Sequence, residues 1–322
     1  MLKKIGGVVV TNVTPFNPDL TIDEPSYRSL IRFIAGHEGI GAILCNAHAA
    51  EGSALSREEK QRCIRMACEE VAGRMPVLAC IEAYGTADAI QLVKDAQEAG
   101  AEAVMVCPPP IYAWRAARSP EVALEFFRAI SAATDVALIA FQYYDGAQHS
   151  YSHETLLQIL KENEKIIAVK LALGDNMARY IRDAYAIRDL DRHVAIMPAS
   201  GYLLFSHCMV AADGAITGFA NFAPREVVEL LAAIDAGDLA RARRIEEQLR
   251  PLALAIESEP FFYMHDRYKE AVCMRGLIPN TLVRPPALRI SEAERAKLRQ
   301  AMIESKILPV DRSSQAGGVA AE

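Results

Sequence analysis

The sequence has no long hydrophobic run. In its 322 residues no stretch approaches the roughly eighteen uncharged apolar positions of a membrane-spanning helix. The first residues, Met1–Gly7, contain no apolar stretch of the length that a signal peptide needs. We therefore expect a cytoplasmic protein without a membrane partner.

The sequence also lacks paired cysteine motifs and an excess of basic residues. Its seven cysteines are an odd number and none form a C-x-x-C pair, so we expect reduced thiols. His149 and His153 are four residues apart and could share a helical face, but no third ligand is evident, so we expect no metal site. A nucleic-acid partner would require a basic face, and the formal net charge of -6 argues against one. No phosphate-binding loop or dinucleotide fingerprint is present, so we expect no cofactor.

What the chain does contain is an alternation of short apolar runs and longer helical patterns. The apolar runs are continuous rather than alternating, which indicates parallel strands buried on both faces. The predicted strands are Gly7–Thr11, Gly41–Cys45, Pro76–Ile81, Ala103–Cys107, Val136–Phe141, Ile166–Lys170, Val194–Pro198 and Gly214–Thr217.

This succession of strand–helix units predicts an α/β fold, a (β/α)8 TIM barrel with a C-terminal helical extension. A doubly wound open sheet is the alternative, but it would need a glycine-rich turn where the chain has Asn12–Phe16. We expect the barrel over residues 1–222, a C-terminal helical region over 223–308 and a disordered tail over 309–322. Helical patterns in the second region cover 224–235, 238–257, 261–276 and 291–305.

Lys170 is the first candidate catalytic residue. It ends the apolar run Ile166–Val169, and the catalytic side chains of such a barrel lie at the C-terminal ends of its strands. Poor solvation lowers the pKa of a lysine, and a neutral amine can attack a ketone to form a Schiff base. The competing interpretation is a lysine that extends from the strand end into solvent.

Several segments, in order along the chain, resemble the dihydrodipicolinate synthase / N-acetylneuraminate lyase family. They are Lys3–Phe16, Ile166–Asp175, Ala212–Pro224 and Arg284–Arg295. The resemblance spans about residues 3–308 and places Lys170 on the family's Schiff-base lysine. It implies a (β/α)8 barrel, class I aldolase chemistry on 2-oxo acids, and a homo-oligomer that is a dimer or a tetramer.

The turn after the second strand departs from the family pattern. The family usually has Gly-Thr-Thr-Gly-Glu there, whereas Ala47–Glu51 reads Ala-His-Ala-Ala-Glu. The resemblance implies that amides near Ala49 and Ala50, with the backbone near Ile216, hold the substrate carboxylate. A histidine can move protons near neutral pH, so His48 is a second candidate catalytic residue; a hydrogen-bonded structural histidine is the alternative.

The turn after the fifth strand has lost the family's tyrosine. The aligned residue is Phe141, which has no hydroxyl, and Gly146 lies near the position of the synthase's arginine for a second carboxylate. Tyr143 is a third candidate catalytic residue if the strand continues; otherwise it packs outside the barrel. Phe141 and its aromatic neighbours contact the substrate in this interpretation and favour an aromatic or weakly polar molecule over a polyol.

Together these residues predict a Schiff-base-forming lyase of the aldolase type. We expect it to act on pyruvate or another 2-oxo acid and not to be dihydrodipicolinate synthase itself. Two alternatives remain open. The same lysine would support a dehydratase or deaminase, and a barrel that binds a metabolite without turnover would explain the missing hydroxyl at position 141.

Overall fold

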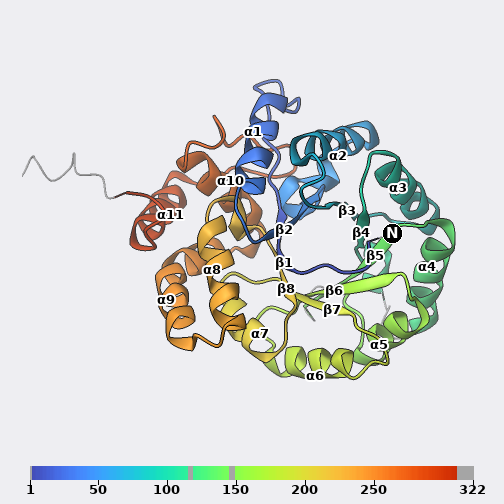
Figure 1. The fold of residues 1–322 in the computed structure, drawn as a ribbon. Coiled ribbons are helices and arrows are strands. Elements are labelled where there is room, and N and C mark those ends of the chain that lie inside the picture. Colours follow the sequence, from blue (N-terminus) through green and yellow to red (C-terminus); the bar gives the residue numbers. More distant parts are fainter. Residues whose placement is uncertain (1, 115–118, 145–148, 310–322) are drawn as a thin grey trace, which may run out of the picture.

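A central barrel of strands surrounded by helices makes up most of the molecule (Figure 1). The computed structural model describes residues 2–114, 119–144 and 149–309. The predictions about Gly146 and about residues 310–322 of the tail lie outside these ranges.

Eight parallel strands form the barrel, and they confirm the predicted (β/α)8 TIM fold. They are β1 Gly7–Thr11, β2 Ile40–Cys45, β3 Val77–Ile81, β4 Ala103–Val106, β5 Ala137–Tyr143, β6 Ile166–Ala172, β7 Ala195–Pro198 and β8 Gly214–Thr217. Hydrogen-bonded neighbours follow the order β7-β6-β5-β4-β3-β2-β1-β8. β5 and β6 each continue two residues beyond their predicted ends, to Tyr143 and Ala172.

Asp213 joins β7 to β8, the two strands that meet at the seam of the barrel. Its backbone N–H donates to the Ile196 carbonyl at 2.9 Å. Its side-chain Oδ2 accepts from the Ile196 N–H at 2.8 Å. Asp213 thus bonds both the N–H and the carbonyl of Ile196, at a place where β7 and β8 form no regular ladder of hydrogen bonds.

The helices that follow the strands pack around the outside of the barrel (Figure 1). They are α1 Glu24–Ala35, α2 Arg57–Val71, α3 Thr86–Glu98, α4 Pro120–Ala133, α5 His153–Glu162, α6 Met177–Arg188, α7 Leu204–Val210 and α8 Pro224–Asp235. A capping box opens α2: the Glu59 N–H donates to Ser56 Oγ, and the Ser56 N–H donates to the Glu59 carboxylate. The box satisfies two backbone donors that a helix start leaves unpaired.

Three further helices extend one side of the barrel (Figure 1). They are α9 Leu239–Ile256, α10 Met264–Met274 and α11 Glu292–Glu304, close to the predicted helical ranges, and we call them the C-terminal appendage. α8 contacts both α7 and β1 of the barrel and α9 of the appendage. The predicted boundary at residue 222, between the barrel and the C-terminal helical region, therefore stays a prediction.

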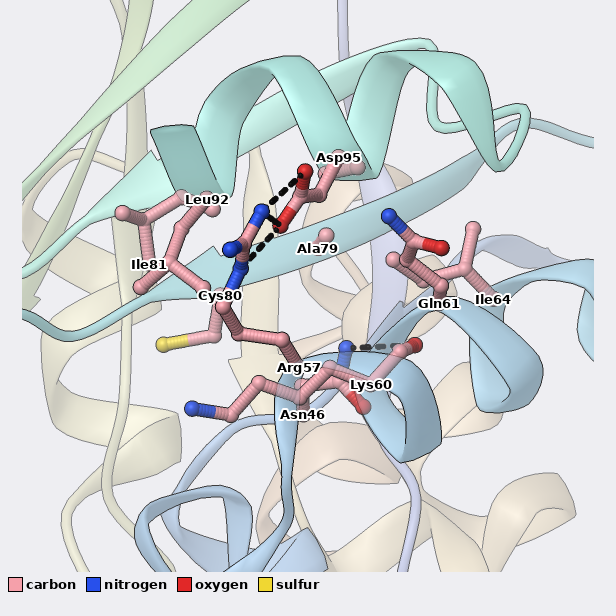
Figure 2. Close-up of a pocket in the computed structure, with 11 residues that line it drawn as sticks. Asn46, Arg57, Lys60, Gln61, Ile64, Ala79, Cys80, Ile81, Leu92 and Asp95 are labelled. Carbon is pink, nitrogen blue, oxygen red and sulfur yellow. Dashed lines mark hydrogen bonds and ion pairs between the residues drawn. The ribbon is translucent and has the colours of Figure 1, made fainter. Parts of the chain in front are cut away.

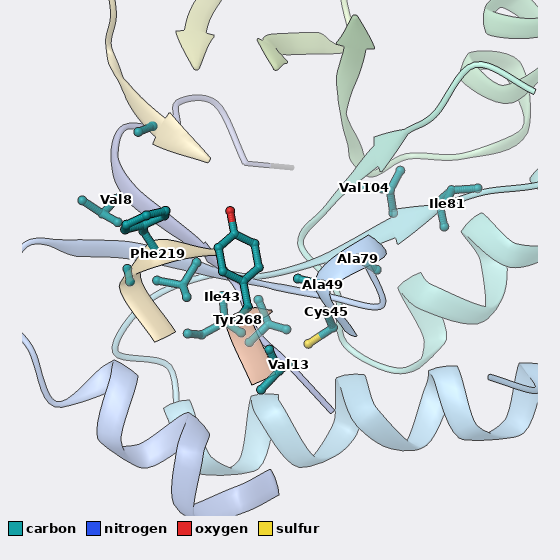
Figure 3. Close-up of a cluster of buried hydrophobic side chains, with 14 of the residues drawn as sticks. Val8, Val13, Ile43, Cys45, Ala49, Ala79, Ile81, Val104, Phe219 and Tyr268 are labelled. Atoms are coloured by element: carbon teal, nitrogen blue, oxygen red, sulfur yellow. The ribbon is translucent and has the colours of Figure 1, made fainter. Parts of the chain in front are cut away.

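Apolar side chains are buried in two layers, one inside the barrel and one between the strands and the helices. Val9, Leu44, Met105 and Ile139 belong to the inner layer. The outer layer reaches the appendage, where Tyr268 of α10 lies against residues of the barrel (Figure 3). The appendage is therefore continuous with the outer core of the barrel.

A buried ion cluster also fixes the appendage to the turn after β2. The Glu51 carboxylate binds Lys269 Nζ of α10 and accepts from the backbone N–H of Arg284 at 2.8 Å. Lys269 Nζ also donates to the Leu282 carbonyl at 2.8 Å and lies 4.4 Å from the centre of the Phe16 ring. Since Lys269 is only 1% exposed, water does not replace these partners.

Replacing Lys269 with methionine should therefore destabilise the protein strongly. The substitution keeps the apolar stem but leaves the Glu51 carboxylate buried without its cation, which typically costs about 3–5 kcal/mol. Urea unfolding followed by circular dichroism measures the loss. The matched control is Lys297→Met on the exposed surface of α11, which should change stability by no more than about 0.5 kcal/mol. Equal midpoints for the two variants would refute an anchoring role for the cluster.

Candidate active site

A cavity of about 390 Å³ opens at the C-terminal ends of the strands. The side of the cavity built by the barrel includes Thr11, His48, Phe141, Tyr143, Lys170, Ile216 and Thr217. The appendage and the segment before α10 add Glu257, Glu259, Phe261, Met264, His265 and Tyr268. Concave sites at this end of a TIM barrel are where its enzymes bind substrate.

Lys170 points from β6 into this cavity. Its backbone pairs with Phe141 of β5 on one side and with Met197 of β7 on the other. Nζ lies 4.2 Å from the centre of the Phe141 ring. Burial lowers the pKa of the amine, and the nearby thiols of Cys80 and Cys107 oppose this shift only in part. The side chain is 8% exposed and does not extend into solvent.

The turn after β2 carries His48 to the same cavity. Asn46 and Glu51 frame it with left-handed backbone, at φ of 61° and 54°. The Asn46 side-chain amide donates to the Lys60 carbonyl of α2 at 3.1 Å, beside the Arg57–Asp95 ion pair that joins α2 to α3 (Figure 2). The turn is thus held from both ends by side-chain contacts of its flanking residues.

His48 and Tyr143 contact each other across the barrel. The Tyr143 hydroxyl and His48 Nε2 are 2.9 Å apart, and the tautomer of the imidazole decides which group donates. Glu82, directly after β3, places Oε1 3.7 Å from the same nitrogen. The neighbouring His48 imidazole lowers the pKa of the Glu82 carboxyl, and burial raises the pKa of Tyr143.

The Phe141 ring lies between this pair and the amine. It stacks on Tyr143 with ring centroids 4.0 Å apart and an angle of 26° between the planes. Tyr143 reaches the cavity because β5 continues to it and residues two apart on a strand share a face. The structure therefore brings Lys170, Phe141, Tyr143 and His48 together.

Ala49 and Ala50 lie elsewhere. Neither lines the cavity, and Ala49 packs in the outer core (Figure 3). The Ala50 N–H donates to the Ala47 carbonyl at 2.9 Å within the turn. The third backbone candidate, Ile216 of β8, does line the cavity.

Several titratable residues in and beside the cavity do not emerge from the sequence, among them Glu82, Glu257 and His265. Glu82 directly follows a predicted strand, so the rule that catalytic side chains lie at the C-terminal ends of barrel strands could have found it. Glu257 and His265 lie in the C-terminal helical region, where this rule does not apply. Burial raises the pKa of Glu257 to about 7. Burial, with the charges of His48 and Lys170, lowers the pKa of His265 to about 3, so this imidazole is neutral near pH 7.

The remaining histidines offer no metal site. His149 packs edge-on against the Tyr143 ring, with centroids 4.5 Å apart. His153 Nδ1 lies 2.7 Å from the Asp183 carboxylate on α6. Within the described ranges, no three His, Cys, Asp or Glu side chains converge as metal ligands.

The whole architecture matches one family of known proteins. The model of the dihydrodipicolinate synthetase family matches residues 4–305. The chain belongs to this family. Membership confirms the resemblance found in the sequence and makes the protein an aldolase-type lyase.

Individual relatives agree with this membership. The 4-hydroxy-tetrahydrodipicolinate synthase of Syntrophus aciditrophicus is 29% identical over 298 residues, which are 92% of this chain and 97% of the relative. The enzyme of the same name from Albidiferax ferrireducens is 30% identical over 307 residues, 95% of this chain and 98% of the relative. The crystal structure of dihydrodipicolinate synthase from Thermotoga maritima superposes with a TM-score of 0.85 at 25% identity, covering 94% and 99% of the two chains. No helix in the described part of this family member is long and apolar enough to cross a membrane.

The contact between His48 and Tyr143 predicts that the two side chains act as one proton-transfer unit. Exchange of the methyl protons of pyruvate for deuterium, followed by NMR, reports imine and enamine formation without a second substrate. Tyr143→Phe removes only the hydroxyl and should slow exchange by about 10²–10⁴-fold, the usual contribution of general acid–base catalysis.

The double variant tests the coupling directly. Because the two groups share one hydrogen bond, His48→Ala with Tyr143→Phe should be no slower than the slower single variant. Tyr185→Phe, on the exposed face of α6, is the matched control and should exchange at the wild-type rate. Near-wild-type exchange in both single variants would show that neither side chain moves the proton.

Proposed function

We propose that this protein is a Schiff-base-forming lyase that acts on pyruvate or another 2-oxo acid, with Lys170 as the nucleophile. The observation that carries the proposal is the buried amine of Lys170, set against an aromatic ring in an open cavity. Because burial lowers its pKa, a larger fraction of this amine is neutral and nucleophilic near pH 7 than of an exposed lysine.

The proposed reaction begins when Nζ attacks the C2 carbonyl of the 2-oxo acid. The resulting carbinolamine loses its hydroxyl as water, with a proton supplied through Tyr143 and His48, and an iminium forms. The C3–C4 bond then breaks and its electron pair forms a double bond between C2 and C3. The π electrons of the iminium move to the nitrogen, so the product on the lysine is an enamine. A carbon–carbon bond can break, or form in reverse, without a cofactor.

We propose that the substrate carboxylate binds between the turn after β2 and the end of β8. The amide of His48 and the backbone near Ile216 are the groups for this role, because both residues line the cavity and Ala49 does not. Ala50 is a weaker candidate than the sequence suggests, because its N–H already donates to Ala47. Phe141 would cover the imine from the side of β5.

The remainder of the cavity favours a fragment that carries no second carboxylate. Lys170 is the only lysine or arginine among the residues that line the cavity in the described part of the chain. Asp175, Glu257 and Glu259 add negative charge there, and several aromatic rings add apolar surface. We therefore propose a substrate different from that of 4-hydroxy-tetrahydrodipicolinate synthase, the name borne by the curated relatives.

We further propose a cytoplasmic homo-oligomer, a dimer or a tetramer. Large apolar side chains are exposed in the turns after β3 and β4, where Tyr84 is 77% and Ile111 is 60% exposed. A contiguous exposed apolar patch marks an interaction site, and we propose that these two turns contribute to one. Analytical ultracentrifugation would measure the state directly.

Incubation with pyruvate and sodium borohydride tests the covalent step. One reduced pyruvyl group per chain should appear, and peptide mass spectrometry should locate it at Lys170. Lys170→Arg should abolish labelling, because a guanidinium retains the charge but does not form the imine. Lys297→Arg is the control and should label normally. Labelling of another lysine would overturn the assignment, and no labelling would favour a protein that binds its ligand without covalent chemistry.

A second substrate tests specificity. Aspartate semialdehyde with pyruvate should give little condensation, because the cavity repels a second carboxylate and the described lining offers no arginine to bind it. The same preparation should still exchange the pyruvate methyl protons, which controls for loss of activity. Rapid condensation would contradict the proposed difference from the synthases.

A further inference from the structure

We propose that Glu257 is the catalytic acid–base residue for the oxygen of the fragment that is cleaved from, or added to, the 2-oxo acid. This inference rests on the proposed Schiff-base function of Lys170 and deepens it. It assigns a catalytic role to the appendage, outside the strand ends that carry the other candidate residues.

The carboxylate of Glu257 occupies a defined binding position at the mouth of the barrel. Glu257 is the C-cap of α9, and its side chain crosses to the loop after β7. There it accepts from the Gly201 N–H and lies 3.4 Å from the Ser200 hydroxyl. A Cβ at Gly201 would stand 2.6 Å from Glu257 Oε1 and 2.5 Å from Cε2 of Phe219, so a residue without a side chain leaves the space that the carboxylate occupies.

The Glu257 carboxylate and the Lys170 amine face the same cavity. Met197 pairs with Lys170 in the sheet, and Gly201 follows Met197 by four residues, beyond the end of β7. Glu257 therefore lines the cavity farther toward the mouth than the lysine, on the β7 side. His48 and Tyr143 approach from β2 and β5. A substrate held as an imine on Lys170 would extend toward the mouth, and its distal oxygen would meet Glu257.

The surroundings suit a group that both takes and gives a proton. Burial raises the pKa of Glu257 to about 7, and the hydrogen bonds from Gly201 and Ser200 oppose that shift only in part. Among the ion pairs of the described residues, none includes Glu257, so no cation fixes it in the ionised form. The titratable groups that face it are Tyr202 of the same loop, Tyr268 of α10, Asp175 after β6, Glu259 and, across the cavity, Lys170.

The proposed step balances without an added reagent. In cleavage of a 4-hydroxy-2-oxo acid imine, the Glu257 carboxylate accepts the proton of the C4 hydroxyl. C4 becomes a carbonyl, the C3–C4 bond breaks, and its electron pair passes to the iminium nitrogen to form the enamine. In the reverse reaction, which adds the enamine to an aldehyde, the protonated Glu257 returns the proton to the new C4 oxygen. Phe141 cannot perform this transfer because it has no hydroxyl.

The test compares Glu257→Gln with Glu247→Gln, a matched change on the exposed face of α9. Glutamine retains an acceptor for the Gly201 N–H but cannot exchange a proton at this pH. Glu257→Gln should still label with pyruvate and borohydride and still exchange the pyruvate methyl protons. Its addition of pyruvate to benzaldehyde, the probe acceptor, should slow by about 10²–10⁴-fold. Glu247→Gln should match the wild type in all three assays.

The pH dependence supplies a readout that a structural role would not move. In the wild type, cleavage of the benzaldehyde adduct should rise, and addition should fall, as pH passes about 7, the pKa of Glu257. Glu257→Gln should remove this transition. Ser200→Ala, which removes a hydrogen bond to the ionised form, should move it to higher pH.

The outcomes separate the two proposals. Wild-type protein that fails to label at Lys170 refutes the proposed function. Normal labelling with unchanged benzaldehyde addition in Glu257→Gln refutes only the role of Glu257. Equal losses of pyruvate exchange and of addition in that variant would also overturn the inference, because they would indicate general damage to the site. So would wild-type protein that forms the imine but adds pyruvate to no aldehyde.

Discussion

The buried carboxylate of Glu51 is the constraint on which the rest of the structure depends. Its left-handed backbone ends the turn that carries His48, and its side chain binds Lys269 of α10. One ion pair thus fixes the position of a barrel turn relative to the appendage. Because the two parts together enclose the cavity, the geometry of the candidate site follows from a contact outside it.

The cavity combines two kinds of chemical surroundings. Around Lys170, burial against an aromatic ring excludes water, which favours the neutral amine that an imine requires, and the thiols of Cys80 and Cys107 oppose this effect only in part. Around His48, the Tyr143 hydroxyl is a hydrogen-bonding partner and the Glu82 carboxylate lies close by, at 3.7 Å. The Phe141 ring contacts both regions, since it lies beside Lys170 Nζ and stacks on Tyr143.

Most of the barrel follows from the sequence because buried parallel strands are continuous apolar runs, and these can be located without neighbours. Lys170 follows for the same reason, since it ends such a run. The contact between His48 and Tyr143 does not, because 95 residues separate them and it requires β5 to continue past Phe141. Glu257 and His265 depend on how the appendage docks, and helical periodicity carries no information about docking.

The division of the site between barrel and appendage has an evolutionary consequence. The amine belongs to β6, whereas Glu257 and His265 belong to the connection between α9 and α10 and to the first turn of α10. Insertions or substitutions in that connection can reshape the outer part of the cavity while the strand that carries the lysine stays unchanged. Under the proposed Schiff-base mechanism, a lineage can in this way exchange one acceptor for another while the chemistry of the lysine stays the same, which is how a single scaffold comes to serve many reactions.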